Sequence, residues 1–139
     1  MPFVIDASVA ACWLLPDEGS ARADAAYARF PADSAVVPSL WWFEMCNIFI
    51  ISERRGRIDS SKTSRALALL AGLPIRLDHQ ADEAVLLELA RQQKLTAYDA
   101  AYLELAQRLD LPLATLDDAL IRAARAIGVA VIGDTNNQD

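Results

Sequence analysis

Histidine and cysteine are scarce in this chain, and their scarcity narrows the chemistry that it can perform. The sequence has one histidine, His79, and two cysteines, Cys12 and Cys46. A single imidazole excludes metal sites built on several histidines and any catalytic scheme that needs two. We expect His79 at the surface near a strand end. The cysteines lie in apolar segments and are expected to be buried free thiols in a reducing compartment, with a disulfide as the open alternative.

Glycine, proline and basic residues are also limited. Five glycines and six prolines in 139 residues argue against a disordered chain. The 13 basic residues are outnumbered by 19 acidic ones, and the net charge is −6. This excludes a general polyanion-coating role, but not a nucleic-acid enzyme with a local basic patch. With 54% hydrophobic residues, the chain suits one domain with a buried core, and we expect a single domain over residues 1–139.

No apolar run is long enough and clean enough for a membrane. Residues 3–15 lack a preceding basic region and contain Asp6, which excludes a signal peptide. Residues 34–52 approach transmembrane length, but Pro38, Glu44 and Asn47 fall inside the run. A central acid costs about 2.5–3.5 kcal/mol on insertion scales. A buried strand followed by a buried helix is the better interpretation, and we expect a soluble, cytoplasmic protein.

Short β-prone segments alternate with longer helical ones along the chain. This alternation indicates an α/β fold with a central parallel sheet of four to five strands, covered by helices on both faces. The helix that starts at residue 39 is apolar nearly all round and is therefore expected to be buried. The strands are predicted at 2–6, 34–38, 73–78, 111–117 and 128–134, and the helices at 7–15, 20–30, 39–55, 60–72, 80–93, 97–109 and 117–126.

Four acidic residues stand among apolar or small neighbours, where an acid is an unusual choice: Asp6, Glu44, Asp99 and Asp117. Asp6 and Asp117 each follow a predicted strand and precede a helix, a position that favours Asp as a helix N-cap. Asp99 follows Thr96 by three residues, a spacing typical of a capping box. Taken one at a time, these three acids are explained by capping as well as by function.

Glu44 has no such explanation. It lies in the middle of a predicted helix, next to Trp42, Phe43 and Met45, and no cation follows before Arg54. A buried carboxylate without a partner is costly and is normally protonated or replaced. Glu44 is therefore the strongest single indication of a functional site.

The predicted fold brings the four acids together. In an open parallel sheet, ligands bind beyond the carboxyl ends of the strands. Asp6 and Asp117 follow the first and fourth strands, and Asp99 begins the helix that leads into the fourth. Two carboxylates about 4 Å apart repel by about 4 kcal/mol at an effective dielectric constant of about 20. Three such pairs approach the ~5–15 kcal/mol stability of a whole domain, so the cluster requires protonation or a cation.

Carboxylate oxygens without histidine or cysteine favour Mg²⁺ or Mn²⁺. Such ions usually act on phosphates, by activating a water and stabilising charge on the phosphoryl oxygens. We therefore expect Asp6, Glu44, Asp99 and Asp117 to hold one or two ions as the catalytic residues of a phosphate-directed site.

Three further polar residues lie beside these acids. Ser8 and Asn47 are candidate supporting residues, with a helix-start hydroxyl and a buried hydrogen-bonding amide as their alternative roles. Asp118 neighbours Asp117 but points about 100° away around a helix, so a first-turn surface acid is its expected role.

The motifs that contain these acids resemble those of the PIN-domain family, and within it the VapC-type toxins of bacterial toxin–antitoxin pairs. The resemblance runs nearly the full length and rests on VIDASV, EMCN, LTAYDAAYLELA and ATLDDAL. The third motif is the most specific, because an acid, two tyrosines and a leucine–alanine stripe recur in that order in such toxins. The doubled Asp117-Asp118 leaves open which acid faces the metal, and the position after the strand end favours Asp117.

The resemblance implies an α/β/α sandwich and a Mg²⁺- or Mn²⁺-dependent endoribonuclease that hydrolyses RNA phosphodiester bonds. It also implies a homodimer and a cognate VapB-like antitoxin that wraps the toxin and inhibits it. Within the same family, a housekeeping or DNA-directed nuclease and a non-catalytic binding module are the alternatives. A receiver-type phospho-acceptor domain is disfavoured, because Asp6 stands alone and the only lysines are Lys62 and Lys94.

A local basic stretch is the sequence's candidate for substrate contact. Residues 53–65 carry five cations and two acids within a chain of net charge −6. Arg54, Arg55 and Arg57 are therefore predicted to contact RNA phosphates, with a solvated helix end as the alternative. Trp41 and Trp42 cannot share one helix face, so we expect one in the core and the other at a dimer or antitoxin surface.

Overall fold

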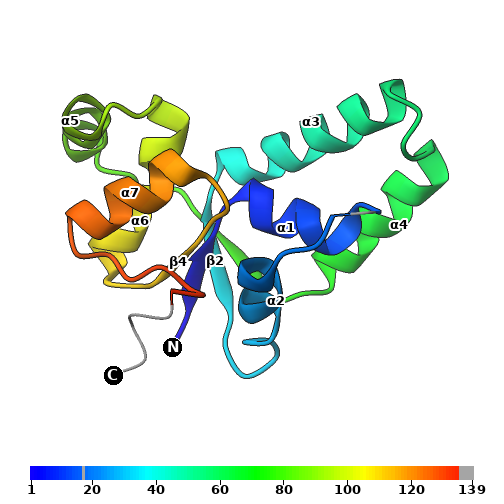
Figure 1. Cartoon of the computed structure of the whole chain (residues 1–139), viewed down its shortest axis with the longest axis horizontal. Helices are drawn as coiled ribbons and strands as arrows, with labels where there is room; N and C mark the ends of the chain where they lie inside the picture. Colours follow the sequence, from blue (N-terminus) through cyan, green and yellow to red (C-terminus); the bar gives the residue numbers. More distant parts are fainter. Residues whose placement is uncertain (17, 135–139) are drawn as a thin grey trace.

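Four parallel strands form the centre of the molecule in a computed structural model that describes residues 1–16 and 18–134 (Figure 1). They are β1 (Phe3–Ile5), β2 (Ala35–Pro38), β3 (Ile75–Asp78) and β4 (Leu113–Ala114). The sheet order is β3-β2-β1-β4, so that the first strand pairs with both the second and the last. Val4 is in register with Val36 on one side and Leu113 on the other. This order confirms the predicted α/β fold with a parallel sheet.

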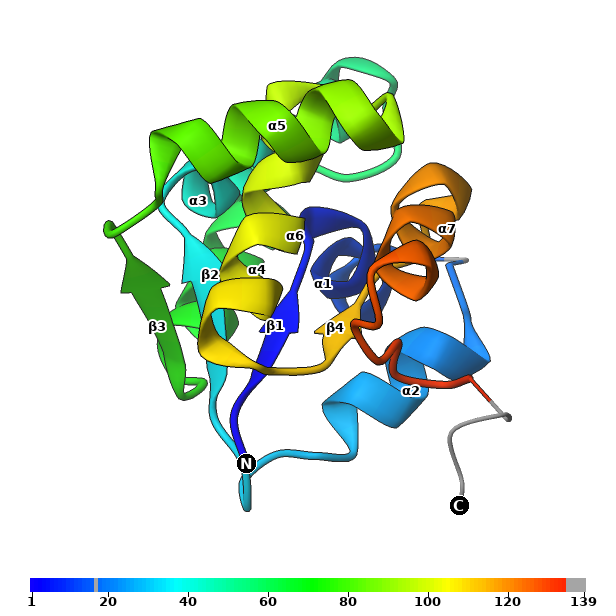
Figure 2. The same ribbon diagram turned by 90° about the vertical axis from the view of Figure 1, so that its left-hand side faces the viewer.

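Helices cover both faces of the sheet. In Figures 1 and 2, α5, α6 and α7 lie on one side of the strands, and α1, α2, α3 and α4 lie on the other. The helix α6 contacts β1, β2 and β4 directly, while α5 and α7 pack beside it. In the described part of the chain the helices are α1 (Ala7–Leu14), α2 (Ala21–Tyr27), α3 (Leu40–Arg54), α4 (Ser60–Ala71), α5 (Glu83–Gln93), α6 (Ala97–Leu109) and α7 (Asp118–Ala126).

Short polar side chains begin most of these helices. In each case a side-chain oxygen accepts a hydrogen bond from a backbone N–H in the first turn, which satisfies a donor that would otherwise lack a partner. The capping residue of α1 directly follows β1, and that of α7 follows β4 by three residues, so both helices begin near the carboxyl edge of the sheet. The capping residues are Asp6, Ser20, Asp59, Asp82, Thr96 and Asp117.

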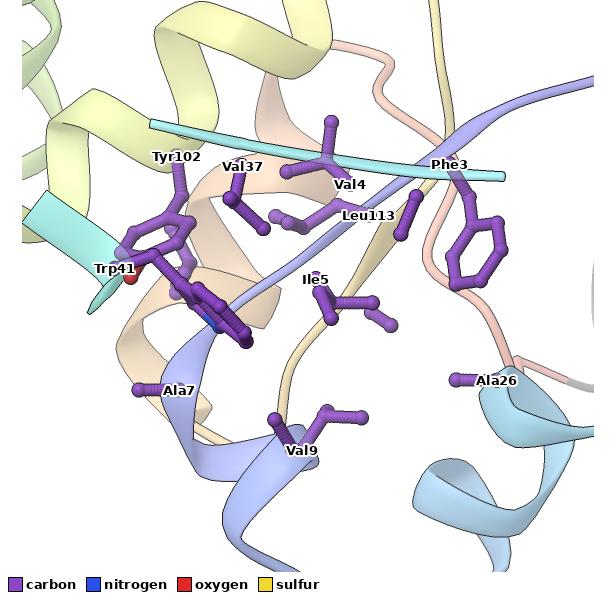
Figure 3. Close-up of a cluster of buried hydrophobic side chains, with 14 of the residues drawn as sticks. Phe3, Val4, Ile5, Ala7, Val9, Ala26, Val37, Trp41, Tyr102 and Leu113 are labelled. Atoms are coloured by element: carbon purple, nitrogen blue, oxygen red, sulfur yellow. The ribbon is translucent and has the colours of Figure 1, made fainter. Parts of the chain in front are cut away.

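The core lies between the sheet and the two helix layers. All three residues of β1 are fully buried, and Val37 of β2 lies near the rings of Trp41 and Tyr102 (Figure 3). Each such buried aliphatic or aromatic side chain contributes about 1.5–3 kcal/mol relative to exposure. Trp41 is thus the core tryptophan, as predicted for one of the pair, while Trp42 is only partly buried.

Two sequence predictions about regular structure were wrong. The strand expected at 128–134 is reduced to a single bridge between Val131 and Leu113. Gly128 and Gly133 adopt φ values of +79° and +92°, and these left-handed conformations interrupt an extended strand. The helix α3 is also not buried all round, because Phe43 and Ile50 are 75% and 41% exposed. Only one stripe of this helix packs against the core, and it contains Trp41, Met45, Phe49 and Ser52.

Three smaller expectations can be compared with the structure. Cys12 and Cys46 are free thiols, so the disulfide alternative is wrong, and both are partly rather than fully buried. His79 is exposed and directly follows β3, as expected. Among the described residues, no helix has the length and apolar character needed to cross a bilayer.

Candidate metal centre

Asp6 lies at the carboxyl end of β1, where the chain turns into α1. Its Oδ1 accepts hydrogen bonds from Ser8 Oγ at 2.6 Å and from the Val9 backbone N–H at 3.2 Å. Only 6% of the residue is exposed, and burial raises the pKa of its side chain from 3.8 to about 6. The hydrogen bonds act in the opposite direction, because they favour the charged form, but they do not outweigh desolvation.

Thr115 joins Asp6 to Asp117 across the gap between β1 and β4. Its hydroxyl donates to Asp6 Oδ2 and accepts from the Asp117 backbone N–H at 3.0 Å. Ser8 Oγ makes a second link, because it accepts from the Leu116 N–H at 3.1 Å while donating to Asp6. Two hydroxyls therefore fix the orientation of the Asp6 carboxylate relative to the loop that carries Asp117.

Glu44 lies in the second turn of α3 and is held by a tyrosine from the opposite helix layer. The Tyr102 hydroxyl of α6 donates to Glu44 Oε1. Burial raises the pKa of Glu44, the Tyr102 hydrogen bond lowers it, and the nearby Asp99 charge raises it. Burial and the Glu44 carboxylate together raise the pKa of Tyr102, so the phenol remains a hydrogen-bond donor.

Asp99 and Asp117 occupy the first turn of α6 and the N-cap of α7. The Asp99 N–H donates to Thr96 Oγ1 at 3.1 Å, and Asp117 Oδ1 accepts from the Leu120 N–H at 2.8 Å. Burial raises the pKa of Asp99, and the negative charge of Asp117 raises it further. The capping geometry predicted for both residues is present, and their carboxylates still interact electrostatically.

The four acids form a chain of interacting carboxylates. Glu44 raises the pKa of Asp6, Asp99 raises that of Glu44, and Asp117 raises that of Asp99. The structure thus brings the four sequence-predicted acids to one edge of the sheet. Each arrives from a different element: the end of β1, the N-cap of α7, and the N-terminal turns of α3 and α6.

The donor set has the chemistry of a site for a hard divalent cation. It is made of carboxylate oxygens, of which those of Asp6, Glu44 and Asp99 are buried or partly buried and those of Asp117 belong to an exposed residue. In the described ranges none of the four acids forms an ion pair with Lys, Arg or His. Oxygen donors of this kind suit Mg²⁺ or Mn²⁺. Over residues 1–16 and 18–134, however, no three His, Cys, Asp or Glu side chains converge tightly enough to form a ready-made metal cluster. The acids share an edge rather than a closed cage.

The supporting residues differ in how close they come to this edge. Ser8 is bonded directly to Asp6, as described above. Asn47 is exposed on α3, so the buried hydrogen-bonding role considered for it is wrong. Asp118 is also exposed and begins α7 on the surface, which agrees with its expected role.

The predicted basic residues lie at the far end of a groove from these acids. Arg55 and Arg57 line a groove of about 310 Å³ that reaches Ser8 and Leu116 beside the acidic edge. Arg57 donates to Glu18 at 3.1 Å and to the Pro16 carbonyl at 3.4 Å. Arg54 is exposed in the last turn of α3 and does not line this groove.

Thr115 and Tyr102 are the site residues that sequence reasoning missed. Thr115 is fully buried and lies two residues before Asp117, while Tyr102 follows Asp99 by one helical turn. Both positions stand inside the motifs quoted for the acids. For Thr115 the spacing to the nearest acid was the available signal, and for Tyr102 also its place in the motif with two tyrosines. Neither signal shows the hydrogen-bond partner, because the partners of these hydroxyls are 109 and 58 residues away in sequence.

Three solved structures share this fold at low sequence identity. PAE2754 from Pyrobaculum aerophilum has a TM-score of 0.70 at 22% identity, covering 88% of this chain and 84% of that one. A toxin–antitoxin complex from Klebsiella pneumoniae gives 0.56 at 17% identity, covering 80% and 82%. VapC20 of Mycobacterium tuberculosis, a Sarcin-Ricin loop cleaving toxin, gives 0.59 at 15% identity, covering 87% and 94%.

The structural comparisons show only that the fold is shared. A comparison with protein-family models identifies the family. No curated protein sequence matches the chain significantly. The sequence model of the PIN domain family, by contrast, matches residues 3–126, which include all four acids and every strand of the sheet. The chain therefore belongs to the PIN domain family.

Proposed function

We propose that this protein is a Mg²⁺- or Mn²⁺-dependent endoribonuclease and the toxin of a type II, VapBC-like toxin–antitoxin module. The observation that carries the proposal is the edge formed by Asp6, Glu44, Asp99 and Asp117. These four carboxylates interact with one another, and none of them is paired with a cationic side chain of the described residues. Membership of the PIN domain family and the likeness to two toxin structures support it.

In this proposal each acid has a positional role at the carboxyl edge of the sheet. Asp6 is the most buried and the most firmly oriented, since Ser8 and Thr115 hold its two oxygens. Glu44 is positioned by Tyr102, and Asp99 and Asp117 by the helix starts that they occupy. A divalent ion held there supplies Lewis acidity, which lowers the pKa of water and stabilises charge on the phosphoryl oxygens. The carboxylates orient an incoming phosphodiester indirectly, because they themselves repel it.

The groove between α1 and α3 is the proposed path for one side of the RNA. Its floor is apolar and includes Ala11 and Ile48, and its end is marked by the guanidinium groups of Arg55 and Arg57. Guanidinium groups suit phosphate oxygens because they offer paired N–H donors. Arg54 extends the same basic end from the surface of α3.

Protein partners are proposed from the family and from one surface. Phe43 and Ile50 are exposed seven residues apart on α3, and a separation of two helical turns places them on one face. Exposed large apolar side chains of this kind are typical of protein contacts. We propose that such contacts serve a homodimer and a VapB-like antitoxin.

The test of the function is cleavage of RNA with controlled metal content. We expect purified protein to cut single-stranded RNA in Mg²⁺ or Mn²⁺, to stop in EDTA and to recover when either ion is added back. Asp6→Ala and Asp99→Asn should reduce the cleavage rate by more than about 100-fold, beyond the range of outer-shell changes, with circular dichroism spectra unchanged. Full activity in either variant would show that these carboxylates are not catalytic.

The same experiment separates the alternatives. Cleavage of single-stranded DNA in preference to RNA would favour a DNA-directed nuclease. Calorimetry that detects no binding of Mg²⁺ or Mn²⁺, together with an absence of cleavage, would favour a non-catalytic module with the same fold.

A further inference from the structure

A second groove lies on the other side of Leu116, between α2 and α7. It has a volume of about 580 Å³ and is lined by Ser20, Arg22, Leu116, Asp118, Arg122 and Arg125, with Ala21 and Ile121. Leu116 also lines the groove between α1 and α3, and it directly precedes Asp117. The two grooves therefore meet next to the acidic edge and leave it in different directions.

Three arginines face this second groove, and two of them are held in place. Asp134 accepts from Arg125 Nε and a terminal nitrogen at 3.0 and 2.6 Å and pairs with Arg22 at 2.9 Å. Its carboxylate is only 7% exposed, so it fixes both guanidinium groups from beneath. Gly133 permits this approach, because a Cβ there would lie 2.9 Å from Arg22 Cγ.

The third arginine is the one most accessible to a ligand. Arg122 is exposed, and over residues 1–16 and 18–134 it has no carboxylate within ion-pairing distance. Asp118, Arg122 and Arg125 are separated by four and three residues in α7, so they lie on one helix face. Along that face the charge changes from negative beside the acidic edge to positive further away.

We propose that the groove between α2 and α7 binds a backbone phosphate of the RNA strand adjacent to the scissile phosphate, with Arg122 as its main contact. This assignment rests on the proposed ribonuclease function. The three arginines that line the groove outnumber its one lining acid, Asp118, together with Asp134, which pairs with two of the arginines, in a chain whose net charge is −6. The guanidinium groups held by Asp134 retain further N–H donors, because each arginine carries five.

The position of the groove favours a phosphate of the same strand over an unrelated anion. Arg122 is five residues after Asp117, and a helix rises about 1.5 Å per residue, so the Arg122 backbone lies about 7.5 Å further along the helix axis than Asp117. The apolar floor of Leu116 and Ile121 connects the two positions. A strand that enters along Arg55 and Arg57 would leave along Arg122.

Binding of a fluorescein-labelled single-stranded RNA of mixed sequence tests this proposal. The parent protein carries Asp99→Asn to stop cleavage, and Kd is measured by anisotropy over a series of salt concentrations. We expect Arg122→Ala to raise Kd several-fold and to reduce the slope of log K against log salt by about 0.7, the value for one lost phosphate contact with a single strand. Asp118→Asn should tighten binding. Arg76→Ala is the matched control, because Arg76 is an exposed arginine on β3, at the opposite edge of the sheet from β4.

Each remaining outcome has a distinct meaning. If the parent binds RNA and Arg122→Ala leaves both Kd and the salt slope unchanged, the groove is not a phosphate site while the proposed function stands. If the parent binds no RNA and the unmutated protein cleaves none, the ribonuclease proposal and the groove assignment both fail. An equal loss of affinity for a polyglutamate peptide would identify a general anion surface and overturn the assignment to RNA phosphate.

Discussion

The molecule contains two groups of buried or partly buried acids, and they are treated in opposite ways. Asp78 and Glu104 surround Arg108, whose Nε lies 2.8 Å from Glu104 and whose terminal nitrogen lies 2.7 Å from Asp78. That partner lowers the pKa of Asp78. Asp6, Glu44 and Asp99 have no such partner among the described residues, and burial raises the pKa of each.

The contrast separates acids that have a cationic partner within the chain from acids that have none among the described residues. The cluster of Arg108, Asp78 and Glu104 joins α6 to the end of β3. Glu104 Oε2 also accepts a hydrogen bond from the backbone N–H of Asp82, the N-cap of α5. Both carboxylates of the cluster therefore contact a cation that belongs to the chain. Asp6, Glu44 and Asp99 at the carboxyl edge have no such contact in the described ranges, so protonation or an external cation is needed to offset their charges, and raised pKa values of this kind are frequent at functional sites.

The largest effect is expected from removing Arg108, the cationic partner of Glu104 and Asp78. Arg108→Met would leave Glu104, which is 1% exposed, as a buried charge without its partner. We expect a loss of about 3–5 kcal/mol in the free energy of unfolding, measured by urea denaturation. Arg91→Met is the control, because the Arg91–Glu88 pair is exposed and should contribute less than about 1 kcal/mol. Equal effects of the two changes would remove the distinction on which the comparison rests.

The two groups should also respond to pH with opposite signs. The folded pKa of Asp6 is raised from 3.8 to about 6, so the folded state binds the proton more tightly than the unfolded state. In EDTA, stability should therefore fall as pH rises from about 4 to 6, by up to roughly 3 kcal/mol at about 1.4 kcal/mol for each pKa unit. For Asp78, whose folded pKa is lowered, stability is present above the unfolded value and is lost as pH falls below about 4.

Urea denaturation at several pH values, with Asp6→Asn and Asp78→Asn, measures these two contributions. Asp6→Asn should flatten the loss between pH 4 and 6, whereas Asp78→Asn should flatten the loss in acid. If Asp6→Asn leaves the dependence of the free energy of unfolding on pH unchanged, Asp6 is not the group that causes the loss between pH 4 and 6.

A divalent ion should offset the free-energy cost of the unpaired carboxylates at the carboxyl edge and stabilise the folded state. At a free Mg²⁺ or Mn²⁺ concentration about 100 times the dissociation constant, the folded state gains about 2.7 kcal/mol. Thermal denaturation should show this gain in the wild type and a much smaller one in Asp99→Asn, and none of it should depend on Arg108. Equal stabilisation of wild type and Asp99→Asn would place the ion elsewhere.

The smallest effect concerns the hydroxyl that orients Asp6. Thr115→Val removes the donor to Asp6 Oδ2 and the acceptor for the Asp117 N–H. We expect metal affinity to fall about 10- to 100-fold, as for other groups that position a ligand, while the fold persists. Thr63→Val is the matched control, since the hydroxyl of Thr63 on α4 donates at 2.6 Å to Glu53, which lies in the last turn of α3. Calorimetric titration with Mn²⁺ compares the two, and an unchanged affinity in Thr115→Val would exclude the positioning role.

Much of the fold was predictable because local patterns and the sheet agree. The helix expected at 39–55 is α3, Leu40–Arg54, and the strand expected at 34–38 is β2, Ala35–Pro38. The segment 128–134 was misread, because its apolar residues resemble a strand while two glycines turn the backbone. Apolar alternation records burial, and burial alone does not distinguish a strand from a packed loop.

The acids of the site were predictable, but the hydroxyls that orient them were not. Asp6 and Glu44 stand out because an acid among apolar neighbours requires a reason. The roles of Thr115 and Tyr102 are not visible in the sequence, since each depends on a hydrogen bond to a distant residue that forms only in the folded chain. Long-range hydrogen bonds leave no local trace in the sequence.

The order of the strands has a consequence for biosynthesis. Asp117 and β4, the strand that pairs with β1 on that side, are synthesised more than 100 residues after Asp6. Chains emerge from the N-terminus at roughly 5–20 residues per second, so Asp6 spends several seconds or more without Thr115 to orient it. A nascent chain that ends before residue 117 lacks Asp117 and cannot assemble the four-acid edge. The activity proposed for this edge therefore requires translation to have passed Asp117.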